Sequence, residues 1–218
     1  MSATDNRRPL ASRNTGWAAA VTRFLARTSV SPNQISIASM VAALAACVAF
    51  WAAGHAEGFV ARAVLFAAAA AFCQLRLLCN LLDGMVAIEA GKAAPDGAFW
   101  NEFPDRVSDL LILAGVGYGI GHPALGWVAG ALAILTAYVR ELGRGCGLAA
   151  DFSGPMAKPH RMAVVTAAAL LSMLEPLWNG RNEALWAALW LVALGSGVTV
   201  IRRAWRVVTG LRSGAARG

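Results

Sequence analysis

The side chains best suited to chemistry lie in one short acidic segment of the chain. Six of the twelve acidic residues fall between positions 83 and 109. Asn80 and Asp83 are three residues apart, and Asn101 and Asp105 are four apart, so on helices each pair shares one face. Hard oxygen ligands of this kind suit Mg²⁺ or Mn²⁺. The spacing therefore predicts a divalent-metal site formed by these four side chains.

The composition of the chain indicates what kind of element positions these residues. Of 218 residues, 58% are hydrophobic and only 14% are charged, and the mean hydropathy is +0.56. A soluble domain usually has about 25% charged residues. The apolar excess excludes disorder, and 22 glycines without a period exclude collagen. Four cysteines without metal-finger spacing are expected to act as small hydrophobic residues. We therefore expect an integral membrane protein.

Apolar stretches divide the chain into membrane spans. A helical crossing needs about 20 apolar residues. The uncharged stretch 110–139 is interrupted by Gly121-His122-Pro123, which predicts two helices joined by a tight turn. The third span must begin near Gly97, because 110–119 is too short to cross. The predicted spans are 34–54, 62–79, 97–119, 124–139, 162–174 and 184–201.

The distribution of basic residues predicts the orientation. With an internal N-terminus and six spans, only Arg62 and Arg181 lie near the outer face, and the other seventeen Lys and Arg lie inside. We expect both termini to be cytoplasmic, with the protein in a bacterial inner membrane. No cleaved signal peptide is expected. The net charge of +7 then indicates contact with anionic lipid and not with nucleic acid.

Residues 17–27 have an amphipathic pattern. Trp17, Val21 and Phe24 fall on one helical face, while Arg23 and Arg27 share another. This favours a helix in the membrane interface, with an ordinary solvated tail as the alternative. The expected fold class is thus an all-α membrane protein, with six transmembrane helices preceded by an interfacial helix. The expected divisions are a cytoplasmic tail with this helix (1–33), a catalytic domain (34–206) and a basic tail (207–218).

The acidic segment resembles the signature of the CDP-alcohol phosphotransferases, D-x2-D-G-x2-A-R-x8-G-x3-D-x3-D. Residues 80–105 reproduce its spacing without a gap. The positions identical to the signature are Asp83, Gly84, Ala87, Gly97 and Asp105. Ser31-Pro32-Asn33 is similar to the Pro-Asn entry into the family's first span.

The resemblance implies a reaction in which an alcohol hydroxyl attacks the β-phosphorus of a CDP-linked lipid and CMP leaves. It implies Mg²⁺ or Mn²⁺ at Asn80, Asp83, Asn101 and Asp105, with Asp105 also the catalytic base. It further implies nucleotide binding at Asp83, Gly84, Ala87 and Gly97. The expected donor is CDP-diacylglycerol, the acceptor is a small alcohol such as glycerol 3-phosphate, and the expected assembly is a homodimer in membrane lipid.

A second basic group follows the fourth span. In family members that use a phosphorylated alcohol, similar cations bind its phosphate, so the resemblance implies this role for Arg140, Lys158 and Arg161. Arginine suits bidentate phosphate contact. Ordinary positive-inside charge is the alternative explanation.

Three departures from the signature affect these expectations. Asn80 and Asn101 replace two aspartates, and Ile88 replaces the arginine. Two carboxylates neutralise about two positive charges. We therefore expect this site to bind metal more weakly than the family's four aspartates, and to hold one ion instead of two, unless Glu102 or Asp109 supplies further negative charge. Lys92 or Arg106 is the available substitute for the lost nucleotide contact.

Two other functions remain open from the sequence. The neutral substitutions favour a divergent member that binds CDP-lipid or a partner without turnover. A small ion transporter would need polar residues near the middle of the bilayer. The acidic residues here gather near one face of the membrane instead, which favours the enzyme over the transporter.

Overall fold

The computed structural model describes residues 15–89, 91–92, 95–177 and 179–215, and this part of the chain contains helices but no strands. The predicted amphipathic segment and all six predicted spans contain helices, and residues 207–215 of the predicted basic tail continue the last helix. Residues 1–14 and 216–218 of the two predicted tails lie outside the described residues. The elements in chain order are α1 (Gly16–Ala26), α2 (Pro32–His55), α3 (Phe59–Glu89), α4 (Gly97–Gly119), α5 (Pro123–Gly145), α6 (Lys158–Ser172), the 3-10 helix η2 (Glu175–Leu177) and α7 (Glu183–Ala215).

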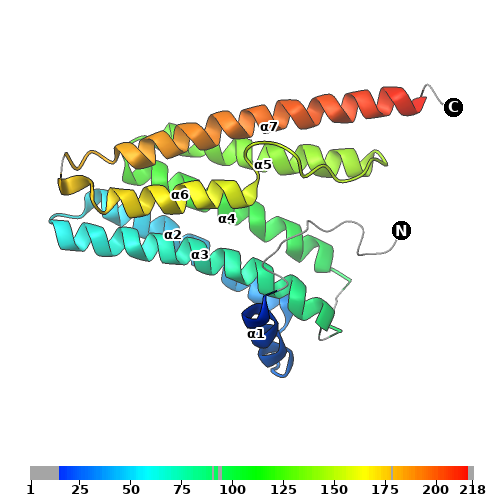
Figure 1. Cartoon of the computed structure of the whole chain (residues 1–218), viewed down its shortest axis with the longest axis horizontal. Coiled ribbons are helices and arrows are strands. Elements are labelled where there is room, and N and C mark those ends of the chain that lie inside the picture. Colours follow the sequence, from blue (N-terminus) through cyan, green and yellow to red (C-terminus); the bar gives the residue numbers. More distant parts are fainter. Residues whose placement is uncertain (1–14, 90, 93–94, 178, 216–218) are drawn as a thin grey trace.

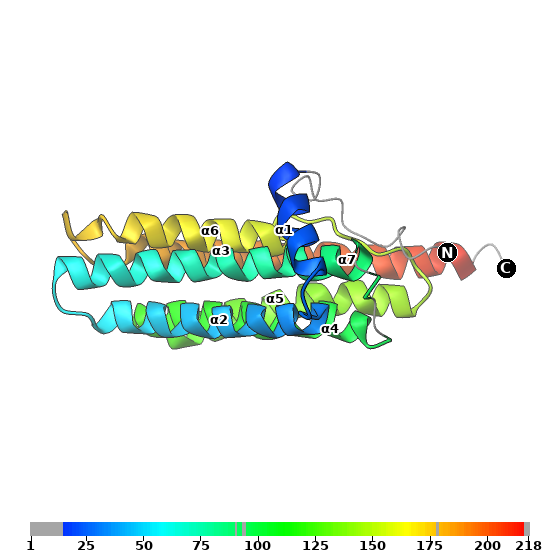
Figure 2. The ribbon, with the colours of Figure 1, turned by 90° about the horizontal axis from the view of Figure 1, so that it is seen from below.

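The long helices form a bundle of two layers. Helices α3, α6 and α7 lie side by side in one layer, and α2, α4 and α5 lie in the other (Figures 1 and 2). Helix α2 packs against both α3 and α4. This brings the half of the acidic segment on α3 toward the half on α4. Helix α1 lies against the side of the bundle at an angle to the long helices, where Ala18 packs with Leu81 and Met85 of α3 (Figures 1 and 2).

Local sequence explains where the helices begin and end. Ser31 caps α2: its hydroxyl accepts a hydrogen bond from the Gln34 N–H, and the Gln34 side chain accepts one from the Ser31 N–H. Pro32 occupies the first turn, where its missing N–H costs no hydrogen bond. Between α4 and α5, Gly121 has a φ of +73°, and Pro123 begins α5. The predicted break at 121–123 is therefore confirmed.

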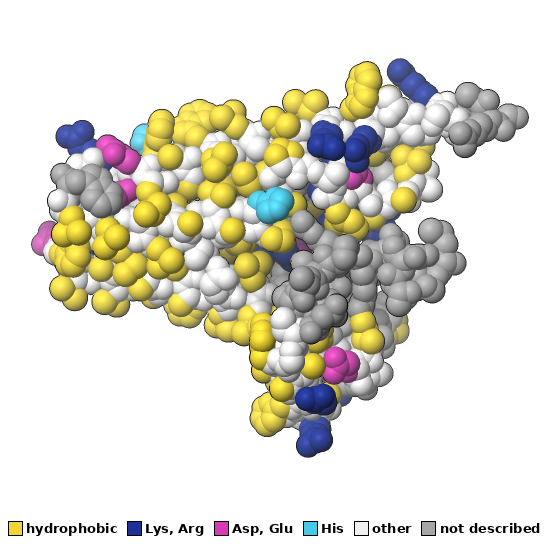
Figure 3. Space-filling view, in the orientation of Figure 1, with side chains coloured by type: hydrophobic (Ala, Val, Ile, Leu, Met, Phe, Trp, Pro, Cys, Tyr) yellow, Lys and Arg dark blue, Asp and Glu magenta, His cyan; other side chains and the backbone are white. Residues whose placement is uncertain are grey.

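The apolar surface confirms an all-α membrane protein. Hydrophobic side chains cover the middle of the bundle and charged side chains gather toward its ends (Figure 3). In the described part of the chain, four helices are long and apolar enough to cross a membrane: α2, α3, α5 and α7. Helix α4 carries the acidic residues, and α6 has only 15 residues. The six crossings therefore remain a prediction.

Small residues allow the helices to approach closely. A Cβ added to Gly115 of α4 would lie 2.5 Å from the Cα of Cys47 on α2, and one added to Gly117 would lie 2.8 Å from the Cα of Gly126 on α5. Alanines also occupy many of the buried positions of α2 and α3. Close packing of small residues is a common way for helices to associate within lipid, and here it fixes the axes that carry the acidic residues.

Candidate active site between α3, α4 and α6

Asn80 and Asp105 form the direct link between the two halves of the acidic segment. The Asn80 side-chain amide of α3 donates a hydrogen bond to Oδ1 of Asp105 on α4. The Asn80 carbonyl oxygen accepts a bond of 2.8 Å from the hydroxyl of Ser39 on α2. The predicted meeting of these helices is therefore present, although α3 continues beyond the site to Glu89.

Asp83 lies one helical turn after Asn80 and is held just as firmly. Its Oδ2 accepts a 2.7 Å hydrogen bond from the Ser36 hydroxyl, and its Oδ1 accepts a 2.6 Å bond from the Gly84 N–H. The side chain is almost fully buried. Sequence reasoning missed Ser36 and Ser39. Their signal is a pair of hydroxyls three residues apart within an otherwise apolar span, on one face of α2.

Three buried or partly buried cations surround the carboxylates of α4. Lys158, at the start of α6, donates to Oδ2 of Asp105. Arg76 of α3 lies 3.4 Å from Oδ1 of Asp105 and 2.7 Å from Oδ1 of Asp109, and it is fully buried. Arg161 completes the group at 2.5 Å from Oδ2 of Asp109. A buried charge is tolerated when it is paired and hydrogen-bonded, as these charges are.

Asn101 does not join this group. Its side chain is exposed, and its amide lies 3.5 Å from the carboxylate of the neighbouring Glu102. Glu102 itself pairs with Arg106 and Arg140. The third aspartate position of the signature, occupied by Asn101, therefore contributes nothing to the contacts around Asp105.

The residues suggested as substitutes are engaged elsewhere. Glu102 and Asp109 are both paired with arginines, so neither carboxylate is free to offset the charge of a metal. Lys92 donates to the backbone oxygens of Thr28 at 2.7 Å and Val30 at 3.3 Å. Ile88, which stands at the arginine position of the signature, is exposed.

Open space adjoins the two signature glycines. A Cβ added to Gly84 or Gly97 would meet no atom within 4 Å in the described chain. Ala87, one turn after Asp83, is half-buried. The small side chains at these positions therefore leave room for a ligand beside the helices, as expected for a nucleotide.

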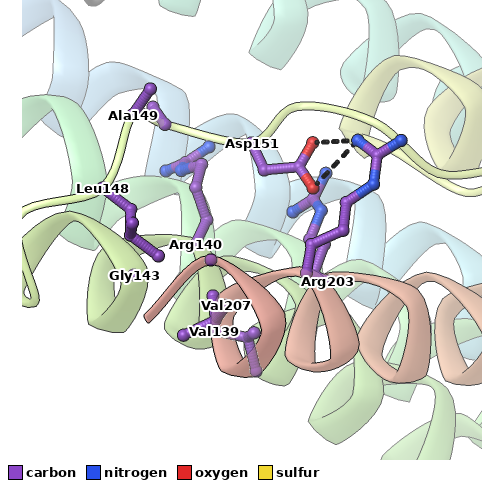
Figure 4. Close-up of a pocket in the computed structure, with 11 residues that line it drawn as sticks. Val139, Arg140, Gly143, Leu148, Ala149, Asp151, Arg203 and Val207 are labelled. Carbon is purple, nitrogen blue, oxygen red and sulfur yellow. Dashed lines mark hydrogen bonds and ion pairs between the residues drawn. The ribbon is translucent and has the colours of Figure 1, made fainter. Parts of the chain in front are cut away.

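A basic pocket of about 310 Å³ lies between α5, α7 and the segment 148–151 (Figure 4). Arg140, Arg203 and Arg206 line it, and Arg206 lies 3.4 Å from the Asp151 carboxylate. Partial burial raises the pKa of Asp151. Hydrogen bonds from Ser153 and the nearby guanidinium groups outweigh this effect, so that pKa lies below its ordinary value. Asp151 is thus a fixed negative charge within an otherwise positive pocket.

The donor set fits one hard divalent cation. Asp83 and Asp105 interact electrostatically, and Asn80, one helical turn before Asp83, contacts Asp105. Two carboxylates and one amide oxygen are the ligands that Mg²⁺ and Mn²⁺ prefer. Within the described residues, no three His, Cys, Asp or Glu side chains gather at one point. A set of three ligands would need the amide oxygen of Asn80, which accepts from the Ser39 hydroxyl here and would have to turn toward Asp105.

Comparisons with known proteins identify relatives over most of the chain. No model of a known protein family matches it. The chain is 31% identical over 153 residues to an archaetidylinositol phosphate synthase of Aeropyrum pernix, which covers 70% of this chain and 73% of that protein. It is 28% identical over 188 residues to a phosphatidylinositol phosphate synthase of Streptomyces avermitilis, covering 83% of this chain and 73% of the relative.

The fold is also similar to crystal structures of the phosphatidylinositol phosphate synthase of Mycobacterium tuberculosis, at 22% identity. The structure with CDP-DAG bound has a TM-score of 0.71 and covers 87% of this chain and 92% of that one. The complex with manganese and citrate has a TM-score of 0.72, with coverage of 88% and 89%. These values establish a shared fold, and the second structure agrees with the use of divalent metals in this group of enzymes.

The sequence relatives, the shared fold and the signature spacing in residues 80–105 lead to one assignment. The chain belongs to the CDP-alcohol phosphotransferase family, the membrane transferases of phospholipid biosynthesis.

Proposed function

We propose that this protein transfers a phosphatidyl group from CDP-diacylglycerol to a phosphorylated alcohol and releases CMP. The observation that carries the proposal is the contact between Asn80 and Asp105, with Asp83 one turn away. This contact joins the two halves of the signature into one site. The names of the relatives support both the reaction class and a polyol phosphate acceptor.

Asp105 is the proposed catalytic base. Its carboxylate accepts the proton of the acceptor hydroxyl, and the hydroxyl oxygen forms a bond to the β-phosphorus of the donor. The bond between that phosphorus and the bridging oxygen breaks, and CMP leaves with the electron pair. Asn80, Asp83 and Asp105 are the residues that would hold a divalent metal, which would neutralise the charge of the diphosphate. The open space at Gly84, Ala87 and Gly97 accommodates the nucleotide.

The acceptor phosphate is assigned to the cations contributed by α5 and α6. Arg140 lines the basic pocket, and Lys158 pairs with Asp105. Arg161 is buried against Asp109, so its proposed role is to hold the start of α6 in place beside the phosphate. The names of the relatives favour an inositol phosphate over glycerol 3-phosphate, because their products carry phosphatidyl or archaetidyl groups on inositol phosphate.

The proposed setting is a bacterial inner membrane crossed six times, with both termini in the cytoplasm. Helices α4 and α6 support this count because they run along the other four within the same bundle (Figures 1 and 2). In α1, Trp17 and Phe24 are exposed while Ala18 and Thr22 are buried on α3, as expected for a helix at the membrane interface. A homodimer remains our expectation for the assembly.

The direct test is CMP release by purified full-length protein in lipid nanodiscs. CDP-diacylglycerol and Mg²⁺ would be supplied with inositol 1-phosphate, glycerol 3-phosphate or unphosphorylated inositol. We expect release with inositol 1-phosphate and little with unphosphorylated inositol. Release only with glycerol 3-phosphate would overturn the acceptor assignment. Tight donor binding without CMP release from any acceptor would favour a binding protein instead.

A further inference from the structure

We propose that this chain binds a single divalent cation, and that the Lys158 ammonium takes the place of a second cation beside Asp105. The inference rests on the proposed function, since it concerns the same site, but it makes a separate statement about metal stoichiometry. Three properties of the site lead to it: the partners of the Asp105 oxygens, the balance of charge, and the engagement of the remaining acids.

The first property is that both oxygens of Asp105 already have donors from the protein. Asn80 donates to Oδ1, and Lys158 donates to Oδ2. Arg76 lies 3.4 Å from Oδ1 as well. A carboxylate has about four acceptor sites, so these three donors leave room for one ion. A second ion would have to displace one of the donors.

The second property is the charge of the group. Three carboxylates, Asp83, Asp105 and Asp109, face three cations, and the group is neutral before any metal enters. The cations are Arg76, Lys158 and Arg161. One divalent ion adds two positive charges, which the two negative charges of a nucleotide diphosphate balance. Before the phosphorylated acceptor binds, a second ion would leave two positive charges uncompensated in a largely buried site, which is strongly unfavourable.

The third property is that neighbouring acids cannot supply the missing charge. The Glu102 carboxylate pairs with Arg106 and Arg140, and the Asp109 carboxylate pairs with two buried arginines. Moving either one to a metal would leave guanidinium groups unpaired. Lys158 is different, because its side chain remains about a quarter exposed and can leave Asp105 for solvent or for a phosphate. The ammonium is therefore the exchangeable cation of the site.

This arrangement has a thermodynamic consequence. Without nucleotide, an incoming ion adds charge to a neutral site and must compete with Lys158, so metal binding should be weak. With a diphosphate present, metal and nucleotide each offset the charge of the other. The nucleotide must then raise the affinity for metal by the same factor as the metal raises the affinity for nucleotide, because binding free energies are reciprocally linked.

Mn²⁺ binding, followed by electron paramagnetic resonance on the full-length protein in nanodiscs, tests the proposal without turnover. We expect one Mn²⁺ per chain, bound more tightly when CDP is present. Lys158→Met should increase the Mn²⁺ affinity about tenfold, because it removes a competing charge next to Asp105. Lys92→Met is the matched control, since Lys92 is the other lysine of the chain and binds backbone oxygens. We expect it to bind Mn²⁺ like the wild type.

A second variant keeps the proposal testable if Lys158→Met does not fold. Asn80→Asp leaves Lys158 in place and puts a carboxylate against Asp105, so it should bind Mn²⁺ more tightly than wild type. Two Mn²⁺ per wild-type chain would overturn the proposal, as would equal affinities in all variants. The expected Mn²⁺ pattern without CMP release would instead reject the proposed function and leave the single-ion inference standing.

Discussion

At the scale of single residues, Arg76 is the centre of the charged group. Its guanidinium is fully buried and contacts both Asp105 and Asp109 through one nitrogen. Within the described part of the chain, its Nε and Nη1 have no hydrogen-bond partner. Burying an arginine is costly unless carboxylates compensate it, so the stability of the fold depends on these two acids.

We expect Asp109→Asn to destabilise the protein by about 3–5 kcal/mol, because it leaves Arg76 and Arg161 buried beside a neutral amide. Thermal unfolding in detergent measures the effect. Asp151→Asn is the control: this carboxylate pairs with the half-exposed Arg206, so its loss should change the melting temperature little. Equal melting temperatures for the two variants would contradict the importance of the buried group.

Asp105 is the proposed catalytic base, so the rate of the reaction should depend on it. We expect Asp105→Asn to lower the rate of CMP release by about 10²–10⁴-fold, since an amide cannot take the acceptor proton. Steady-state kinetics with saturating donor measure the change, and Glu57→Gln, in the exposed connection between α2 and α3, is the control. Full activity of Asp105→Asn would exclude this residue as the base.

At the scale of elements, α2 holds the site together although it contributes no charged group. It packs between α3 and α4 and presents Ser36 to Asp83 and Ser39 to Asn80. Its contact with α4 depends on Gly115, because a side chain there would meet the backbone of Cys47. A shift of α4 away from α2 would also move Asp105 away from Asn80.

We expect Gly115→Ala to destabilise the protein by about 1–3 kcal/mol through this overpacking. Gly197→Ala on α7 is the matched control: an added Cβ there meets no atom within 4 Å in the described chain. That variant should be neutral or slightly more stable, since alanine favours helix. Thermal melting of the two proteins checks the prediction, which fails if Gly115→Ala melts at or above the control.

At the scale of the whole molecule, the bundle presents apolar helices to lipid, and the acidic group lies toward the end at which α3 finishes and α4 begins (Figures 1 and 3). The four cysteines are free, and only Cys146, after α5, is exposed. It lies on the connection that we assign to the cytoplasm. The exposed Arg181 lies on the connection between α6 and α7, which we assign to the outside.

Labelling with a membrane-impermeant maleimide tests this topology. In intact cells we expect no labelling of Cys146, and strong labelling after the membrane is opened. An Arg181→Cys variant carrying Cys146→Ser should be labelled in intact cells, because six crossings place these two connections on opposite sides. Labelling of both positions from the same side would exclude the six-span arrangement.

The sequence by itself determined the helices and the kind of solvent around them. Apolar stretches, the capping residues of α2 and the break at 121–123 act locally, so they can be read along the chain. The spacing of Asn80, Asp83 and Asp105 also predicted that these side chains share one site. Helical periodicity fixes the face on which each of them lies.

Only the tertiary structure decided which side chains contact one another within that site. The pairing of Lys158 with Asp105 joins residues 53 positions apart, and the bond from Ser36 to Asp83 joins residues 47 positions apart. Asn101 has the correct spacing and yet stays exposed. The rotation and separation of neighbouring helices determine such contacts, and these depend on the packing of small residues from several helices at once, which no local pattern encodes.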